Sequence, residues 1–183
     1  MSENENKESE TSKLEEARQA AEQLFRAKSV ILGSTGRDSE PHASYAPFVR
    51  DEEGALFVYL SELARHYHTL SENPRASALF IEDEGTAANI FARKRLTVQC
   101  AVQRLNRDDG EAESIFSRFA DRYGKFFSHL KEMRDFHLFR LVPENATLVI
   151  GFGAAYRFSQ GDFSQISWLR GEHGKAGAGM AHA

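Results

Sequence analysis

The side chains of this chain that could carry out chemistry are seven histidines, one cysteine and a run of three cations, Arg93-Lys94-Arg95. A single cysteine, Cys100, can form neither an internal disulfide nor a thiolate-built zinc or iron–sulfur site. Histidine is therefore the main candidate ligand for any transition metal. Cys100 falls on the apolar face of the alternating segment 93–105, which favours an inert core thiol over a nucleophile.

Two of the histidines, His66 and His68, lie two residues apart in a segment with helical spacing. Residues i and i+2 point about 200° apart on a helix, so this pair cannot readily bind one metal ion. Arg65 and His66 could instead neutralise an anionic group of a ligand. The alternative is an ordinary solvated helix face.

The run Arg93-Lys94-Arg95 is a candidate anion site. Arginine binds carboxylate and phosphate groups bidentately, and no carboxylate adjoins the three cations in the sequence. Alternation places Arg93 and Arg95 on one face of a predicted strand and Lys94 on the other. A charge cluster that protects a strand end explains the same pattern, so both interpretations stay open.

His173 lies in the segment 171–183, in which eight of thirteen residues are Gly or Ala. That composition is typical of a flexible tail. A neutral imidazole on a flexible arm can also bind heme iron as an axial ligand, provided that a carboxylate or carbonyl holds its second nitrogen. Asp135 is one candidate for that carboxylate, and an ordinary turn residue is the alternative. His182 could compete with His173 as the ligand.

The composition places these side chains in one ordinary folded domain. The 183 residues are 41% hydrophobic and 27% charged, with a formal net charge of -4. This weakly acidic balance disfavours nucleic acid or an anionic membrane as a partner. Because the chain has no apolar run of membrane-spanning length and its N-terminus is charged, we expect a cytoplasmic protein.

The apolar spacing predicts an α+β fold with a mostly antiparallel, barrel-like sheet and flanking helices. From the composition we expect a disordered tail over residues 1–13, the folded domain over residues 14–170 and a flexible tail over residues 171–183. The predicted strands are 29–35, 42–50, 55–61, 75–82, 93–105, 136–142 and 147–158, and the predicted helices are 14–28, 63–72, a segment that begins at the capping residue Asp108, and 163–169.

Two features of the predicted sheet mark places where a ligand or partner could approach. Pro47 cannot donate to a sheet ladder, which predicts an edge or a bulge in the strand 42–50. In the strand 147–158, Gly151 and Gly153 leave one face almost bare. A bare strip of backbone lets a flat ligand or a neighbouring chain approach closely. We expect the preceding hairpin turn near residues 143–145.

Six groups of residues, in order from about residue 15 to 175, resemble the bacterial heme-utilisation proteins of the HutZ/HugZ type. Each group is a weak signal alone, but six in register are specific. They are Ser44-Tyr45-Ala46-Pro47-Phe48-Val49, Ala64-Arg65-His66, Phe91-Ala92-Arg93-Lys94-Arg95-Leu96-Thr97, Asp135-Phe136 followed by Leu138-Phe139-Arg140-Leu141, Gly151-Phe152-Gly153 with Ala155-Tyr156, and the Gly171-Glu172-His173 ending.

The resemblance implies a split β-barrel related to the FMN-binding pyridoxamine-phosphate oxidases, working as a homodimer with heme at the subunit interface. It implies a heme-degrading oxygenase that opens the macrocycle with O2 and reducing equivalents and releases iron. An electron donor or a heme-delivery protein would be its further partner. The alternatives on the same fold are an FMN-dependent oxidoreductase and a non-catalytic heme carrier or storage protein.

The resemblance also implies roles on the iron side of the heme. His173 matches the C-terminal histidine that binds the metal. Asp135 matches the carboxylate that hydrogen-bonds this histidine from the other subunit. Together they predict an axial ligand whose basicity is tuned by a carboxylate.

The remaining predicted site residues contact the macrocycle itself. Arg95 matches the distal or propionate-side arginine, and Arg93 adds a second cation beside it. His66 matches the histidine of the Ala-Arg-His motif. By alternation, Gly151 and Gly153 are expected to form the bare wall against the planar macrocycle.

Overall fold

The computed structural model describes residues 3–159, 163 and 165–169 of the chain. The strands are β1 (Ser29–Thr35), β2 (Pro41–Arg50), β3 (Leu56–Ser61), β4 (Arg75–Ile81), β5 (Arg95–Arg104), β6 (Phe136–Gly151), β7 (Ala154–Ser159) and β8 (Ile166–Trp168). The helices are α1 (Glu3–Leu24), α2 (Arg65–Glu72), the 3-10 turn η1 (Ile90–Ala92), α3 (Gly110–Tyr123) and α4 (Lys125–Glu132).

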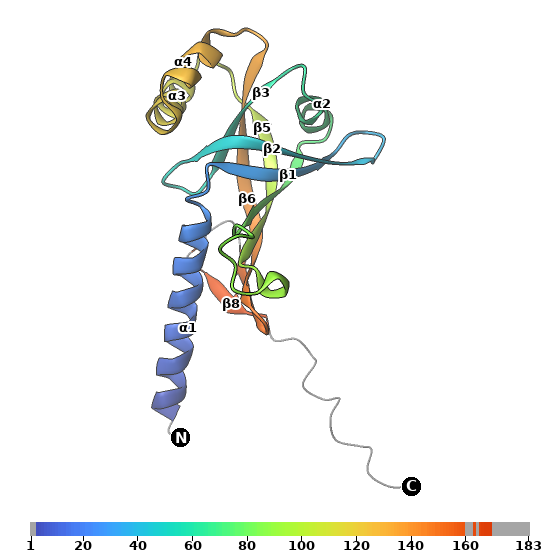
Figure 1. Cartoon of the computed structure of the whole chain (residues 1–183). Coiled ribbons are helices and arrows are strands. Elements are labelled where there is room, and N and C mark those ends of the chain that lie inside the picture. The colour runs from blue at the N-terminus through green and yellow to red at the C-terminus, as the bar shows by residue number, and fades with distance from the viewer. Residues whose placement is uncertain (1–2, 160–162, 164, 170–183) are drawn as a thin grey trace.

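One antiparallel sheet contains all eight strands in the order β3-β2-β1-β4-β5-β6-β7-β8, and a further pairing of β3 with β6 closes the first six into a barrel. The α+β split-barrel prediction is therefore confirmed. β3 pairs with the first part of β6, from Phe136 to Leu141, and β7 pairs with the last part, from Asn145 to Gly151. Figure 1 shows β6 running from the end of the molecule that carries α2, α3 and α4 to the end that carries β8.

The predicted turn at residues 143–145 is wrong, because β6 continues through Pro143. Pro143 pairs with Cys100, next to a register shift between Gln99 and Cys100 on β5. A bulge at this point lets the ladder pass a residue that has no N–H to donate. The hairpin turn comes instead at Gly151-Phe152-Gly153, where Gly153 has φ 68°.

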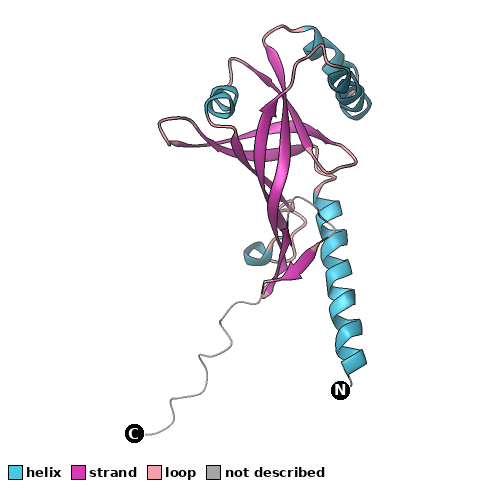
Figure 2. Cartoon of the chain, turned by 180° about the vertical axis from the view of Figure 1, so that it is seen from behind, coloured by secondary structure: helices cyan, strands magenta, loops and turns pink. Residues whose placement is uncertain are grey.

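Two hydrophobic clusters hold the fold together, and β3 belongs to both. Leu56, Val58 and Leu60 face the barrel interior, whereas Phe57 and Tyr59 face the helices α3 and α4. β3 is therefore buried on both faces, in agreement with its almost continuous apolar sequence. The helical hairpin is in this way fixed to the barrel end where β6 begins (Figure 2).

The N-terminal helix begins at Glu3, earlier than the helix predicted from residue 14, so part of the expected tail is helical. The buried residues Ala17, Ala21 and Leu24 pack against the barrel core. Packing of these residues forms the first turns of the helix, and each residue then added to the helix gains a hydrogen bond. The Glu and Lys residues that precede Leu14 in the sequence have good helix propensity. No helix among the described residues is long and apolar enough to cross a membrane.

Two smaller predictions are also corrected. Residues 166–168 form the edge strand β8 rather than a helix, because Trp168 packs on Tyr156 with ring centroids 5.9 Å apart and the strand pairs with β7. Tertiary pairing has overridden local propensity there. The helix α3 has Asp109 as its N-cap rather than Asp108, with no side-chain hydrogen bond to the helix.

Candidate functional site

The predicted site residues of one chain fall into two groups at opposite ends of β6 (Figure 1). A strand of 16 residues has a contour of about 50 Å. The two groups therefore cannot meet within one chain. The first group is His66 and Asp135, where β6 begins, and the second is Arg93, Arg95, Gly151 and Gly153, where it ends.

Asp135 is held in a fixed orientation at the start of β6. The Ser61 hydroxyl donates to Asp135 Oδ2 at 2.8 Å, and the Glu62 N–H donates to the Asp135 carbonyl at 2.8 Å. The second carboxylate oxygen, Oδ1, makes no hydrogen bond with the residues that the structure describes. Asp135 therefore presents a half-buried carboxylate with one oxygen ready to accept a hydrogen bond.

Next to Asp135 lies a hydrogen-bonded chain that no sequence pattern indicated. Arg104 Nη2 lies 2.7 Å from His137 Nδ1, and His137 Nε2 lies 2.6 Å from Glu62 Oε1. Because a guanidinium can only donate, Nδ1 must accept, so the proton of the neutral ring is on Nε2 and is donated to Glu62. Arg104 also donates to the Tyr67 hydroxyl at 3.1 Å. These residues come from separate elements, which is why spacing could not predict the arrangement.

His66 lies half-buried on α2, and its neighbourhood does not fit an anion-binding role. Burial, with a smaller contribution from His42, lowers the pKa of His66 below its usual value of 6.5, so the ring is neutral at pH 7. Arg65 is already paired with Glu40 at 3.1 Å. Within the described ranges, no three His, Cys, Asp or Glu side chains gather closely enough to hold a metal ion.

At the far end of β6, the structure separates the two predicted arginines. Arg93 donates to the Glu82 carbonyl and forms an ion pair with Glu84 at 2.9 Å, and only 17% of its side chain is exposed. The expectation of a cluster without nearby carboxylates is therefore wrong for Arg93, because the loop after β4 folds back onto it. Arg95 donates to the Arg93 carbonyl at 3.1 Å and has no ion pair with a described residue. Of the two, Arg95 keeps its charge available.

The glycines of the predicted bare wall form a hairpin turn instead of a strand face. Gly151 pairs with Ala154, and Gly153 accepts a hydrogen bond from Trp168 Nε1 at 3.2 Å through its carbonyl. The space beside Gly151 is nevertheless open, since a Cβ built there meets nothing within 4 Å. Phe152, between the two glycines, is 75% exposed. The turn thus carries an exposed aromatic ring rather than a bare strip.

Two further predictions have clear outcomes. Cys100 is 1% exposed, and burial raises the pKa of its thiol to about 12, with a smaller contribution from Glu144. Its prediction as an inert core thiol is confirmed. His173 and His182 both lie outside the described residues.

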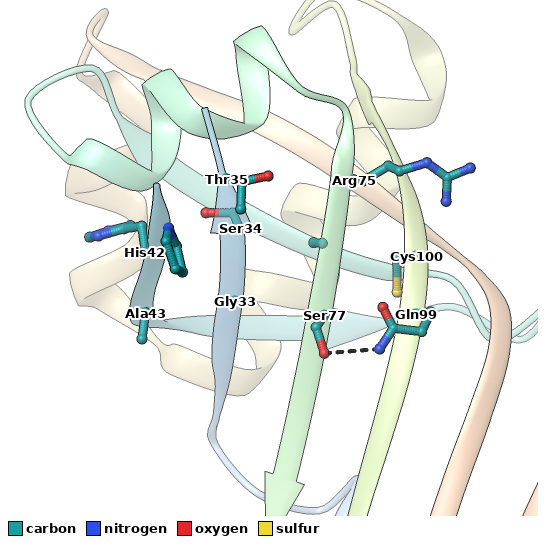
Figure 3. A pocket seen from close by; sticks show the side chains of 11 residues that line it. Gly33, Ser34, Thr35, His42, Ala43, Arg75, Ser77, Gln99 and Cys100 are labelled. Atoms are coloured by element: carbon teal, nitrogen blue, oxygen red, sulfur yellow. Dashed lines mark hydrogen bonds between the residues drawn. The ribbon is translucent and has the colours of Figure 1, made fainter. Parts of the chain in front are cut away.

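The outer face of the sheet also carries a cavity of about 470 Å³, over β2, β1, β4 and β5. Figure 3 shows His42 and Arg75 on opposite sides of a floor that includes Gly33, Ser77 and Gln99. The next register row on this face is apolar. Its members are Tyr45, which is 69% exposed, Ile31, which is 41% exposed, and Leu79.

Residues 15–150 match the family described as pyridoxamine 5′-phosphate oxidase. The chain is 38% identical over 152 residues to heme oxygenase HutZ of Vibrio cholerae, which covers 83% of this chain and 86% of that protein.

Solved structures give the same relationship. The crystal structure of HutZ from Vibrio cholerae, described as a heme storage protein, has a TM-score of 0.65 at 37% identity and covers 68% of this chain and 87% of that chain. ChuZ of Campylobacter jejuni has a TM-score of 0.74 at 30% identity, over 83% of this chain and 61% of that chain. The resemblance to the HutZ/HugZ type is confirmed. The fold and the sequence of this chain agree with those of HutZ over most of the chain. The chain therefore belongs to the pyridoxamine 5′-phosphate oxidase family.

Proposed function

We propose that this protein binds heme between two copies of the chain and degrades it, opening the macrocycle with O2 and reducing equivalents and releasing the iron. The observation that carries the proposal is the 38% identity over 152 residues with a relative described as a heme oxygenase. The same relative is also described as a heme storage protein. Storage without catalysis is therefore the alternative that an experiment must exclude.

The far end of β6 offers surfaces that suit heme. A heme ligand needs apolar contact for its ring and cations for its two propionates. At this end, Ile90, Phe91 and Phe152 expose 54%, 83% and 75% of their area. They lie close in the fold to Arg95, which forms no ion pair with a described residue. These residues fit the proposal that Arg95 contacts a propionate or the distal side and that the turn at Phe152 contacts the ring.

The iron ligand and its supporting carboxylate must come from different copies of the chain. Trp168 pairs with Tyr156, which pairs with Leu148, and about 40 Å of β6 separates Leu148 from Phe136, the residue after Asp135. His173 follows Leu169 by four residues, which can span at most about 14 Å. One chain therefore cannot bring His173 to its own Asp135, which supports a site shared between two copies.

The outer sheet face is where we place the second copy. The exposed residues Tyr45 and Ile31 form an apolar row with the half-buried Leu79 beside the cavity of Figure 3. Exposed apolar patches of this kind mark interaction sites. β3 pairs with β2 only from Phe48 to Arg50, which leaves the Pro47 half of β2 at an edge, as predicted.

In the proposed site, each protein group has a stated task. His173 would hold the iron, and its second ring nitrogen would donate a hydrogen bond to Asp135 of the second copy. The Ser61 hydroxyl keeps Asp135 Oδ2 occupied and so fixes the direction of Oδ1. An imidazole held by a carboxylate is a stronger electron donor to iron. Bound heme itself supplies both the metal that reacts with O2 and the ring that is oxidised.

The FMN alternative is less well supported by this chain. Its phosphate would need Arg65 and His66, yet Arg65 is paired with Glu40 and Asp38, and the lowered pKa of His66 leaves that ring neutral at pH 7. A phosphate would have to compete with these acidic groups. We therefore rank heme above FMN.

Titrations of the heme-free protein with hemin and, separately, with FMN test the choice of cofactor. We expect a Soret band that saturates at a fixed hemin ratio and weaker FMN binding. Tight FMN binding without a Soret band would contradict the proposal. Ascorbate is then added to the heme complex in air, where loss of the heme spectrum with iron release supports catalysis. An intact spectrum supports storage.

The axial ligand is tested by comparing His173→Ala with His182→Ala. We expect His173→Ala to weaken hemin binding or change the axial spectroscopic signature, and His182→Ala to leave both close to wild type. The two histidines share the same Gly/Ala-rich segment, so general effects on the tail cancel in the comparison. Equal effects of the two substitutions would count against His173.

A further inference from the structure

A second group of cations lies at the end of the barrel where β5 ends and β6 begins, around a pocket of about 460 Å³. Three arginines and one histidine are among its lining residues, and no carboxylate is. The full lining is Arg104, Leu105, Asn106, Arg107, Arg134, Phe136, His137 and Leu138. Neither the family resemblance nor the sequence patterns singled out these arginines.

None of the three arginines that line this pocket forms an ion pair with a residue in the described part of the chain. Arg134 is exposed and makes no hydrogen bond or ion pair with a described residue. Arg107 donates only to the Met133 carbonyl, at 3.0 Å, and Arg104 donates to neutral groups. Other arginines of the described chain are paired with carboxylates, for example Arg140 with Glu111 at 3.2 Å.

Two carboxylates beside this pocket accept hydrogen bonds from neutral groups, and neither forms an ion pair with Arg104, Arg107 or Arg134. Glu62 accepts from His137 at 2.6 Å, and Asp135 accepts from Ser61 at 2.8 Å. The half-buried Phe136 and the buried Leu138 form apolar parts of the wall, which reduce the screening of charge inside the pocket. Uncompensated guanidinium groups around an apolar floor are a typical environment for an oxyanion.

We propose that this pocket binds a carboxylate or phosphate group of a ligand, with Arg107 and Arg134 as the binding residues. The hydrogen bond from Arg104 to His137 keeps both of those side chains in place at the pocket wall. The oxyanion could be a propionate of heme or of its ring-opened product, an assignment that rests on the proposed function. It could also belong to a free phosphate ester, which is independent of that function.

The first arm of the test uses inorganic phosphate and the heme-free protein, with binding measured by isothermal titration calorimetry at low ionic strength. We expect Arg134→Gln and Arg107→Gln each to weaken phosphate binding about tenfold. Arg157→Gln is the matched control, because Arg157 is exposed on β7, far from the pocket, and makes no ion pair with a described residue. Its affinity should equal that of wild type.

The second arm compares hemin with its dimethyl ester, which lacks the carboxylates. If the pocket binds a propionate, wild type prefers hemin and Arg134→Gln loses much of that preference, even where phosphate does not bind. If phosphate binding depends on Arg134 but the preference for hemin does not, the pocket binds a free oxyanion. The proposal is overturned if neither affinity depends on Arg134 and Arg107. Failure of hemin to bind at all contradicts the proposed function but leaves the phosphate arm intact.

Discussion

At the scale of single residues, the half-buried hydroxyl of Tyr123 connects three parts of the fold. The Tyr123 hydroxyl lies 2.7 Å from the Lys28 carbonyl and 2.6 Å from the Phe48 carbonyl, and it accepts from the Phe48 N–H at 3.0 Å. It therefore joins the end of α3 to the start of β1 and to β2. Burial raises the pKa of this hydroxyl, which keeps it protonated as a donor.

Replacing Tyr123 by Phe should lower the free energy of unfolding by about 1–3 kcal/mol, because partly buried backbone groups of Phe48 lose their partner. Urea denaturation at pH 7.5 measures the loss. Tyr45→Phe is the control, since Tyr45 is 69% exposed and should change stability by less than about 0.5 kcal/mol. Equal effects of the two changes would contradict the structural role of the Tyr123 hydroxyl.

The lowered pKa of His66 predicts a pH dependence of stability. Burial disfavours the charged ring in the folded state, so between the folded pKa and the ordinary value of 6.5 the unfolded chain binds more protons. Stability is therefore lost as the pH falls below 6.5 toward the folded pKa, and no such loss occurs above 6.5.

Unfolding measured at pH 7.5 and 5.5 tests this sign. His66→Gln should lose less stability than wild type on acidification, because glutamine does not titrate. His68→Gln is the matched control, being exposed on the same helix, and should behave as wild type. A steeper pH dependence in His66→Gln would show that the sign is wrong.

Individual site residues were predictable only when their role depended on their own strand. Cys100 was identified as a core thiol because β5 alternates with period two and shows its buried face directly. Arg93 was not, because the carboxylate of Glu84 and the carbonyl of Glu82 arrive from the loop after β4. The chain from Arg104 to Glu62 requires β5, β6 and the segment after β3 together, and no spacing encodes it.

At the scale of elements, turn chemistry was harder to predict than strand periodicity. Gly151-Phe152-Gly153 was interpreted as part of a strand because its neighbours alternate, yet it forms the turn between β6 and β7. The positive φ of Gly153, 68°, is the physical requirement there. The proline that suggested a turn, Pro143, is instead accommodated next to a bulge.

The two glycines of this turn give a matched pair of substitutions. An added Cβ meets nothing within 4 Å at either glycine, but only Gly153 has a positive φ. Gly153→Ala should therefore lower the free energy of unfolding by about 1–2 kcal/mol through backbone strain, with little effect from Gly151→Ala. Thermal unfolding measures the difference, and equal losses would indicate a steric rather than a conformational cause.

At the scale of the whole molecule, the length of β6 separates the two halves of the site. Its 16 residues place Asp135 at one end of the barrel and Arg95 at the other. In the proposed function, a single chain holds two incomplete halves, and a symmetric dimer would join each half to its complement. The proposed function depends on this arrangement more than on any single residue.

Mixing two variants, one without the proposed iron ligand and one without its supporting carboxylate, tests whether the site is shared between chains. In a dimer of Asp135→Asn with His173→Ala, one of the two sites receives both native groups, so random mixing should restore the native axial signature in about a quarter of the sites. Refolding the variants together, followed by a heme spectrum, measures this recovery. If the native axial signature does not recover in a mixture that is shown to contain mixed dimers, the site is not shared between chains.

The sequence by itself determined the strands β1 to β5, the barrel class, the core cysteine and the family, because these follow from local periodicity and from motifs in register. Tertiary structure decided which cations remain free, where the β6–β7 turn falls and which elements surround His137. Those outcomes depend on contacts between segments distant in the chain, such as Arg93 with Glu84 and Arg104 with His137. Charge compensation and strand register are properties of the folded chain. One sequence pattern is compatible with several strand registers and several pairings of charges.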